Sequence, residues 1–196
     1  MNWSLTKFDR AQLLTFLRAI DRHLPNPTSV VVVGGAAAII GYRSTVRTSD
    51  VDVFAGLTDE FIEAGRQAQE ETGLAIAIEK AAVAEIPYNY EDRVRAVKIT
   101  RLAKLTVIVP DRYDLVLSKA IRCWEHDLDA IEAIHRRQPL VLRTLVQRFE
   151  SELMKIALAA PARNCLNVVI VVGRLFGAAE ARSLARRWGV PTPTKK

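Results

Sequence analysis

The spacing of apolar and polar positions predicts helices at both ends of this chain and a mixed region between them. Apolar residues recur at helical spacing from 6 to 24, and the Pro-Asn-Pro sequence at 25–27 ends that helix. A run of β-branched residues at 29–33 predicts a buried strand, and the small residues at 36–41 predict a short helix. The alternation at 50–54 predicts a second strand.

The middle of the chain continues this alternation of helices and strands. The segment 58–72 predicts an amphipathic helix, with a threonine N-cap, two acidic residues in the first turn and Gly73 at its end. A strand is expected at 74–78. The segments 94–100 and 105–109 are separated by a short polar stretch, which favours a hairpin.

From residue 111 onwards the spacing is helical. The sequence therefore predicts an α/β (α+β) fold, with a mixed-sheet core and a helical C-terminal half. The expected helices are 113–125, 127–136, 139–158, 163–176 and 180–188. The expected parts are an N-terminal helix packed on the core at 1–28, the α/β core at 29–110, a helical region at 111–190 and a flexible tail at 191–196.

The composition supports a folded protein that works in the cytoplasm. Of 196 residues, 49% are hydrophobic, which is enough for a sizeable core. No apolar run reaches the ~18 residues needed to span a bilayer, and the N-terminus lacks the apolar stretch of a signal peptide. Cys123 and Cys165 fit no metal-binding spacing and are expected to be reduced thiols.

Positive charge gathers at the C-terminal end. The net charge is +6, and the segment 161–196 carries many basic residues and a single acidic one, Glu180. Arg182, Arg186 and Arg187 are candidates for contacts with a nucleic-acid backbone, while a solvated helix face is the plain alternative. The aromatic residues of this segment are Phe176 and Trp188, so a platform for stacking bases is not expected there.

Two carboxylates and two glycines are the strongest chemical signal. Residues two apart in a strand share a face, so Asp50 and Asp52 project together while the valines beside them enter the core. Adjacent carboxylates repel each other unless a cation lies between them, and a divalent metal is the usual one. The Gly34-Gly35 pair ends the preceding strand and lets backbone N–H groups approach a phosphate.

In this order, Gly34-Gly35 and Thr48-Ser49-Asp50-Val51-Asp52 resemble the nucleotidyltransferase superfamily typified by DNA polymerase beta. The chain looks most like the small bacterial branch of AbiEii-type toxins and minimal nucleotidyltransferases. The segments 88–93, 114–119 and 127–131 also resemble relatives, so the likeness covers about residues 29 to 135.

The resemblance implies a Mg²⁺-dependent enzyme that transfers a nucleoside monophosphate from an NTP to an acceptor hydroxyl. Asp50 and Asp52 would be the catalytic metal ligands. The acceptor would be the 3′ end of a tRNA or another RNA, and the protein a toxin with a cognate antitoxin. Nucleotide contacts are expected from Gly34, Gly35, Arg47 or Arg43, Thr48, Ser49 and Lys119.

Plain structural interpretations stay open beside this one. The glycine pair also fits a tight turn, the aspartate pair a solvated strand end, and Lys119 a surface salt bridge with Glu125 or Asp114. The superfamily also places a third acidic residue on a later strand, where the segment 94–100 has Arg95 and Lys98 instead. The acidic residues expected at strand ends are Glu79, Glu91, Asp92 and Asp111. We favour an enzyme; the alternative is a catalytically impaired module that binds nucleotide, nucleic acid or a partner.

Overall fold

The computed structural model describes residues 6–81, 85–154 and 161–192. The chain divides into two compact units. Unit 1 comprises Met1–Ala84 and Arg93–Pro110, and unit 2 comprises Glu85–Asp92 and Asp111–Lys196. The tail expected at 191–196 lies outside the described residues from 193 onwards.

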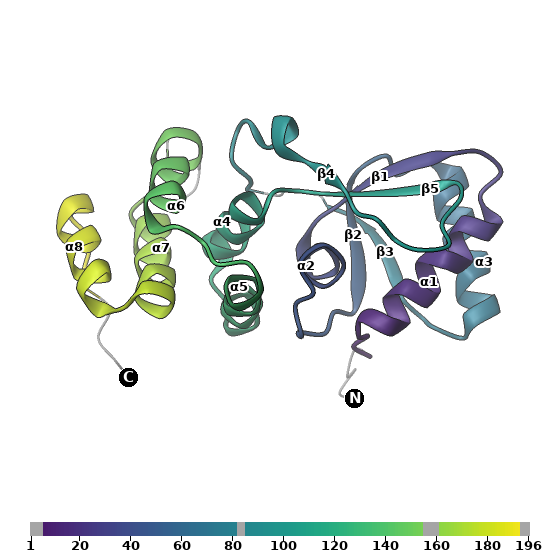
Figure 1. Cartoon of the computed structure of the whole chain (residues 1–196), viewed down its shortest axis with the longest axis horizontal. Helices are drawn as coiled ribbons and strands as arrows, with labels where there is room; N and C mark the ends of the chain where they lie inside the picture. Colours follow the sequence, from purple (N-terminus) through teal and green to yellow (C-terminus); the bar gives the residue numbers. More distant parts are fainter. Residues whose placement is uncertain (1–5, 82–84, 155–160, 193–196) are drawn as a thin grey trace. The chain divides into compact units, whose positions relative to one another are not determined.

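Unit 1 is built on a mixed five-stranded sheet with the strand order β3-β2-β1-β5-β4 (Figure 1). β1 runs antiparallel to β2 and parallel to β5, while β3 is parallel to β2 and β4 is antiparallel to β5. This confirms the expected α/β fold with a mixed sheet. The strands are β1 Thr28–Val32, β2 Asp50–Ala55, β3 Ala77–Lys80, β4 Arg95–Ala96 and β5 Leu105–Val109.

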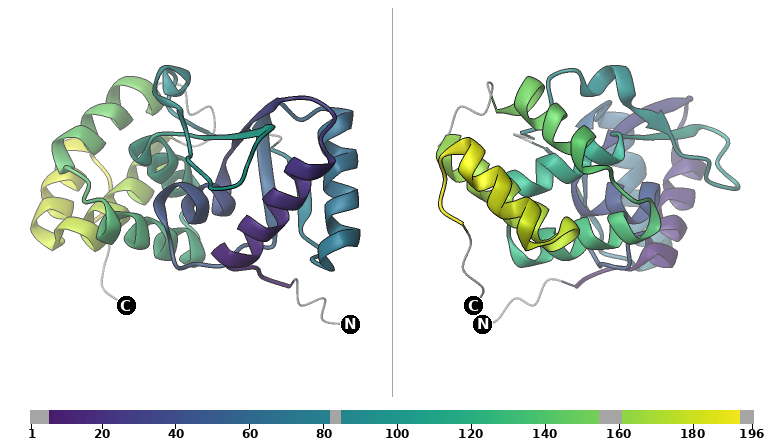
Figure 2. Two further views of the ribbon diagram at one scale, coloured as in Figure 1. Left: turned by 45° about the vertical axis from the view of Figure 1, so that its right-hand side comes forward. Right: turned by 60° about the vertical axis from the view of Figure 1, so that its left-hand side comes forward.

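Three helices cover one face of this sheet, namely α1 Arg10–His23, α2 Gly34–Tyr42 and α3 Asp59–Thr72. α1 and α3 lie side by side (Figure 2, left). Two glycines let these helices pack closely against the sheet. An ideal Cβ on Gly65 of α3 would lie 2.2 Å from the Ile78 side chain, and one on Gly41 of α2 would lie 2.9 Å from the Val109 side chain. The covered face is lined by buried valines, among them Val51 and Val53, as the alternation predicts.

Two strands differ from the expected bounds. The strand expected at 74–78 is observed at 77–80, so Glu79 lies inside β3 rather than beyond its end. The hairpin expected from 94–100 and 105–109 is present, but its first strand is only Arg95–Ala96, continued by a hydrogen bond from Val97 N to Val107 O. Register with a neighbouring strand sets these bounds, and a single segment's composition does not reveal it.

Unit 2 is helical, as expected. Its helices are α4 Arg112–Arg122, α5 Glu125–Arg137, α6 Leu142–Arg148, α7 Pro161–Phe176 and α8 Ala178–Trp188, with a short 3-10 turn at Tyr90–Arg93. The long helix expected at 139–158 is replaced by α6 and a π-helical turn at Phe149–Leu153, and 155–158 lies outside the described residues. No helix in the described part of the chain is both long and apolar enough to cross a membrane.

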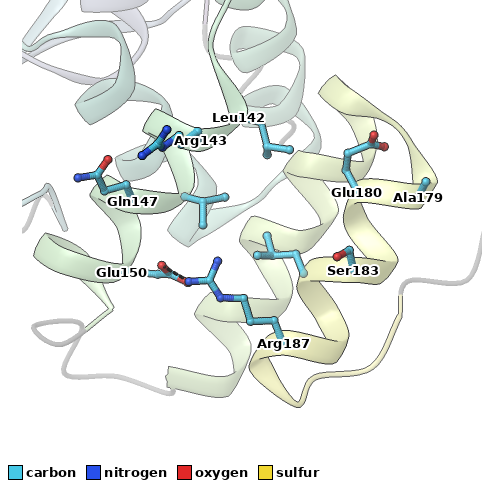
Figure 3. A pocket seen from close by; sticks show the side chains of 10 residues that line it. Leu142, Arg143, Gln147, Glu150, Ala179, Glu180, Ser183 and Arg187 are labelled. Atoms are coloured by element: carbon cyan, nitrogen blue, oxygen red, sulfur yellow. Dashed lines mark hydrogen bonds and ion pairs between the residues drawn. The ribbon is translucent and has the colours of Figure 1, made fainter.

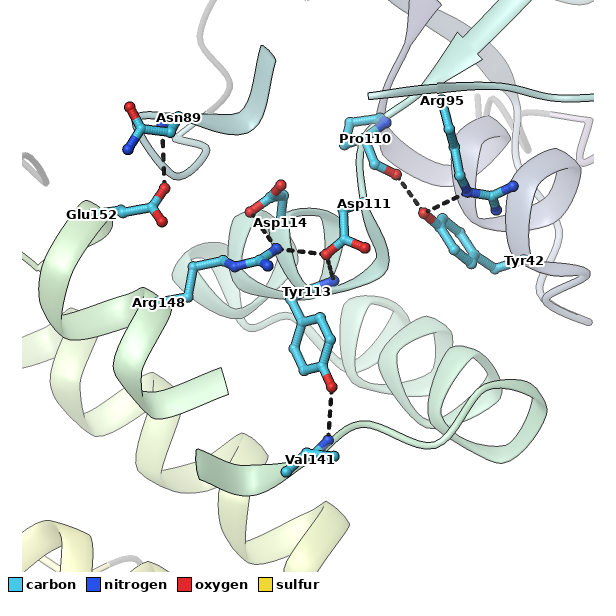
Figure 4. Close-up of polar contacts among 10 residues, drawn as sticks. All are labelled: Tyr42, Asn89, Arg95, Pro110, Asp111, Tyr113, Asp114, Val141, Arg148 and Glu152. Carbon is cyan, nitrogen blue, oxygen red and sulfur yellow. Dashed lines mark hydrogen bonds and ion pairs between the residues drawn. The ribbon is translucent and has the colours of Figure 1, made fainter. Parts of the chain in front are cut away.

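A polar cluster joins α6 to the start of α4 (Figure 4). The guanidinium of Arg148 binds Asp111 and the fully buried Asp114, at 3.0 Å from the latter. The hydroxyl of Tyr113 accepts the backbone N–H of Val141 at 3.0 Å, and Arg148 lies over the Tyr113 ring. Asp111 also caps α4, which explains its place directly before that helix.

In unit 1, the buried carboxylate of Asp21 fixes the turn that leads into β5. It accepts the backbone N–H groups of Ala103, Lys104 and Leu105 at 3.0, 2.7 and 2.6 Å. Burial by itself raises the pKa of Asp21, but these three backbone donors outweigh it and the net pKa is lowered. The turn therefore depends on an ionised carboxylate on α1.

We predict that Asp21→Asn lowers the free energy of unfolding at pH 7 by about 2–3 kcal/mol, because three backbone N–H groups lose a charged acceptor and an amide nitrogen then faces the N–H of Ala103. The folded-state pKa of Asp21 is lowered, so its contribution is complete above the unfolded pKa of about 3.9 and is lost as the pH falls through the folded pKa. Urea unfolding at pH 7 and below pH 4 measures this. A stability difference that does not shrink in acid would contradict it.

Candidate functional site

The turn between β1 and α2 lies against the second aspartate. Val33 caps α2, and its backbone N–H donates to the carbonyl of Asp52 at 2.9 Å. Gly34 has φ +65°, a backbone conformation that favours glycine. An ideal Cβ at Gly34 would lie 2.1 Å from Oδ2 of Asp52, so no side chain fits there. The structure thus brings together the glycine turn and the carboxylate that the sequence predicts as a metal ligand.

The second glycine makes room for Thr48. An ideal Cβ at Gly35 would lie 2.6 Å from the Thr48 hydroxyl oxygen. That hydroxyl donates to Oδ1 of Asp50 at 3.1 Å, and the Ser49 hydroxyl donates to Oδ2 of Asp50 at 2.9 Å. Thr48 is itself held by paired backbone hydrogen bonds with Phe8. Thr48 and Ser49 therefore orient the Asp50 carboxylate.

Asp50 and Asp52 lie in β2 on the face opposite the buried Val51 and Val53. Both aspartates are half-buried, which leaves part of each residue in contact with solvent. Carboxylate oxygens are the ligands that Mg²⁺ prefers, and Mg²⁺ commonly uses one or two of them together with water and substrate phosphates. The donor set and the glycine turn that abuts it fit such an ion.

The strand beside β2 is β3, and it carries an acidic residue at the matching position. The parallel register pairs Asp52 with Glu79, so both residues belong to the same face of the sheet. Glu79 is exposed. Within the described residues, no group of three His, Cys, Asp or Glu side chains is gathered closely enough to hold a metal ion. Glu79 therefore lies on the same face of the sheet as Asp50 and Asp52, but the three carboxylates are not gathered into a metal site.

Arg95 does not lie beside the Asp50 and Asp52 pair, where a third acidic ligand is expected. Its strand, β4, is at the opposite edge of the sheet, separated from β2 by β1 and β5. Its guanidinium lies 4.7 Å from the centre of the Tyr42 ring and donates to the Tyr42 hydroxyl (Figure 4). It also donates to the Gly41 carbonyl at 2.7 Å. The expectation that the 94–100 segment is the third site strand is therefore wrong, because β3 occupies that place.

The two loop arginines before the aspartates are exposed. Arg43 ends α2 in the left-handed conformation. Arg47 lies in the loop that leads to β2, and its nearest hydrogen-bond partner is Gln12 at 3.5 Å. A role for either in binding phosphate stays a prediction.

Lys119 lies in unit 2 and is buried, not on the surface. Its Nζ is 3.2 Å from Oδ1 of Asp127, and Arg122 donates to the same oxygen at 2.8 Å. Asp127 is fully buried, and burial raises its pKa less than these two cations lower it. Glu125, the surface partner considered for Lys119, is bound by Arg174 at 2.8 Å. Lys119 as a nucleotide contact stays a prediction.

The basic C-terminal residues divide into two kinds. Arg182 and Arg186 are exposed on α8 and make no ion pair with the described residues. Arg187 instead binds Glu150 at 2.7 Å across a groove of about 700 Å³ between α6 and α8 (Figure 3). Trp188 donates its indole N–H to the same Glu150. Lys195 and Lys196 lie outside the described residues.

We predict that Gly34→Ala destabilises the protein more than Gly73→Ala. Both glycines have positive φ, but a Cβ at Gly73 meets nothing within 4 Å while one at Gly34 meets the Asp52 carboxylate. Gly73→Ala should lower the free energy of unfolding by about 1–2 kcal/mol, and Gly34→Ala by a further ~1–3 kcal/mol. Chemical denaturation of both variants measures this. Equal losses would show that the Gly34 turn and Asp52 can separate freely.

We also predict that Asp127→Asn lowers the free energy of unfolding by about 3–5 kcal/mol, since it removes the buried carboxylate that Lys119 and Arg122 share. The double variant Lys119→Met, Asp127→Leu removes both buried charges and should recover most of the loss. Thermal and urea unfolding compare the variants. An Asp127→Asn protein as stable as the wild type would contradict the prediction.

Comparison with known proteins places this arrangement in a family. No curated protein and no solved structure matches the chain. A family model described as "Nucleotidyltransferase of unknown function (DUF6036)" matches residues 11–170, a stretch that includes the glycine turn, the aspartate pair and the Lys119–Asp127 pair. The resemblance to the nucleotidyltransferase superfamily is confirmed at this level. The chain belongs to the DUF6036 family of nucleotidyltransferases of unknown function.

Proposed function

We propose that this protein transfers a nucleoside monophosphate from an NTP to an acceptor hydroxyl, with Mg²⁺ held by Asp50 and Asp52. The observation that carries the proposal is the contact of the Gly34 turn with the Asp52 carboxylate. It juxtaposes a helix N-terminus that favours phosphate with two oxygen ligands for a cation. Family membership supports the same reaction class.

Each residue has a distinct task in this proposal. The Gly34-Gly35 backbone receives the triphosphate, because α2 begins at Gly34 and the first N–H groups of a helix have no partner within the helix. Thr48 and Ser49 hold the Asp50 carboxylate in position by their hydroxyl hydrogen bonds. Bound Mg²⁺ would neutralise phosphate charge and so favour attack by the acceptor hydroxyl.

Glu79 is the residue we propose as the third acidic ligand. Its pairing with Asp52 in the β2–β3 register supports this, because neighbouring residues of parallel strands project from the same face. Its exposed position leaves it able to approach an ion that Asp50 and Asp52 already hold. Neither Asp111, which caps α4, nor Arg95 is needed for the site.

For the acceptor, the resemblance to AbiEii-type toxins supports the 3′ end of a tRNA, and with it a toxin that a cognate antitoxin neutralises. The exposed Arg182 and Arg186 on α8 support an RNA acceptor, since they share a helix face and lack acidic partners among the described residues. Arg187, bound to Glu150, contributes less.

A second candidate function is a nucleotidyltransferase-fold module that binds nucleotide, nucleic acid or a protein partner without catalysis. The observation that favours it is that the described carboxylates are not gathered into a group of three. The two functions differ in one measurable property: only the enzyme consumes an NTP.

We predict that replacing both Asp50 and Asp52 by Asn abolishes Mg²⁺-dependent NTP binding and transfer, while the free energy of unfolding is unchanged or higher. Adjacent carboxylates repel without a cation, so neutralising them relieves strain. Calorimetric titration of Mg²⁺-NTP and transfer of labelled nucleotide to a tRNA mixture measure this.

Glu60→Gln is the matched control, because Glu60 is an exposed acidic residue of unit 1 on α3. It should leave NTP binding and transfer intact. Glu79→Gln should weaken transfer; full activity there would exclude Glu79 as a ligand and leave the aspartate pair standing. NTP binding without transfer by the wild-type protein would favour the second function.

A further inference from the structure

An exposed tryptophan, Trp124, lies between the end of α4 and the start of α5. Trp124 is 61% exposed and directly precedes α5. The corner is sharp because Cys123 takes the left-handed conformation at the end of α4, with φ 56°. Single exposed apolar residues are common on protein surfaces, so exposure of this ring is not by itself informative.

The neighbours of the ring make it distinctive. The guanidinium of Arg122 lies 5.7 Å from the centre of the Trp124 ring, over its face. The His126 ring is edge-on to the indole, with ring centres 5.3 Å apart. Both side chains are about half exposed. A flat π surface flanked by nitrogen donors combines the two contacts with which proteins hold unpaired bases and their phosphates.

Arg122 is held in place at this corner by the buried part of unit 2. It donates to Oδ1 of Asp127, which is fully buried and also receives Lys119. A guanidinium has five N–H donors, so this hydrogen bond leaves others for a ligand. Glu125, the exposed acid that follows Trp124 in the sequence, is bound by Arg174 at 2.8 Å, which offsets its repulsion of a phosphate.

We propose that Trp124 stacks against an unpaired base of the RNA acceptor, with Arg122 and His126 contacting the adjacent phosphate. This inference rests on the proposed function, of which it names the acceptor contact. RNA is favoured over a protein partner because the exposed residues around Trp124 are Arg122, Glu125, His126 and Asp129. All four of these described residues are charged or polar, whereas charged residues are depleted at the centre of a protein interface.

Trp188, the other tryptophan among the described residues, does not offer the same platform. Trp188 is half-buried and packs against Phe149 with ring centres 5.1 Å apart. Its indole N–H donates to Glu150. Trp3 lies outside the described residues. The proposed stacking surface therefore lies between α4 and α5, and not in the basic C-terminal segment.

The test measures binding of a short fluorescein-labelled single-stranded RNA by anisotropy, beside a blunt-ended RNA duplex of two strands that has no unpaired base. Trp124→Ala should weaken binding of the single strand about 5- to 100-fold and leave duplex binding unchanged, whereas Trp124→Phe should retain most of the affinity. Tyr88→Ala is the matched control, because Tyr88 is 73% exposed in the same unit and no cation or histidine among the described residues stacks on its ring. Circular dichroism confirms that each variant is folded.

Several results would overturn the inference. These results are an absence of single-strand binding by the wild-type protein, unchanged single-strand binding by Trp124→Ala, or an equal loss of affinity for the single strand and the duplex. A change in oligomeric state or in Mg²⁺-NTP affinity caused by Trp124→Ala would assign the ring to a protein or a free nucleotide instead. Failure of the proposed function would give a different result. If single-stranded RNA binds through Trp124 but no NTP is transferred, the proposed catalysis is wrong and the RNA contact is still supported.

Discussion

The close approach between the β1–α2 turn and β2 is the constraint on which the candidate site depends. Val33 N donates to Asp52 O, and the space beside Gly34 is filled by the Asp52 carboxylate. Because Gly34 also has positive φ, both the backbone conformation and the available volume require glycine. A helix N-terminus and a carboxylate pair are thereby fixed within one piece of unit 1, and nucleotidyl transfer needs that combination.

Strand register decides what can complete the site. The β2–β3 pairing aligns Glu79 with Asp52, while the sheet order moves Arg95 to the far edge, where it stacks on Tyr42. A shift of one residue in β3 would turn Glu79 toward the helices and bring its neighbour to the aspartate face. The chemistry available beside the aspartates therefore follows from a pairing between segments 27 residues apart in sequence.

Unit 2 is organised by buried charge as well as by apolar packing. Lys119 and Arg122 converge on Asp127, and Arg148 joins Asp111 to Asp114. Such pairs fix which helices meet, because a buried charge without its partner is costly. The same Asp127 that neutralises Lys119 also holds Arg122 over the exposed Trp124, so the core of the unit shapes its surface.

The sequence by itself determined the local features: the alternation that buries Val51 and Val53, the Thr58 cap and Gly73 end of α3, and the shared face of Asp50 and Asp52. These follow from periodicity and backbone preference within a few residues. Tertiary structure alone decided the bounds of β3, the distance of Arg95 from the site and the partner of Lys119. Each of these depends on which segments, distant in the sequence, pair with each other. The free energy of that pairing comes from contacts between those segments, which the pattern within one segment does not contain.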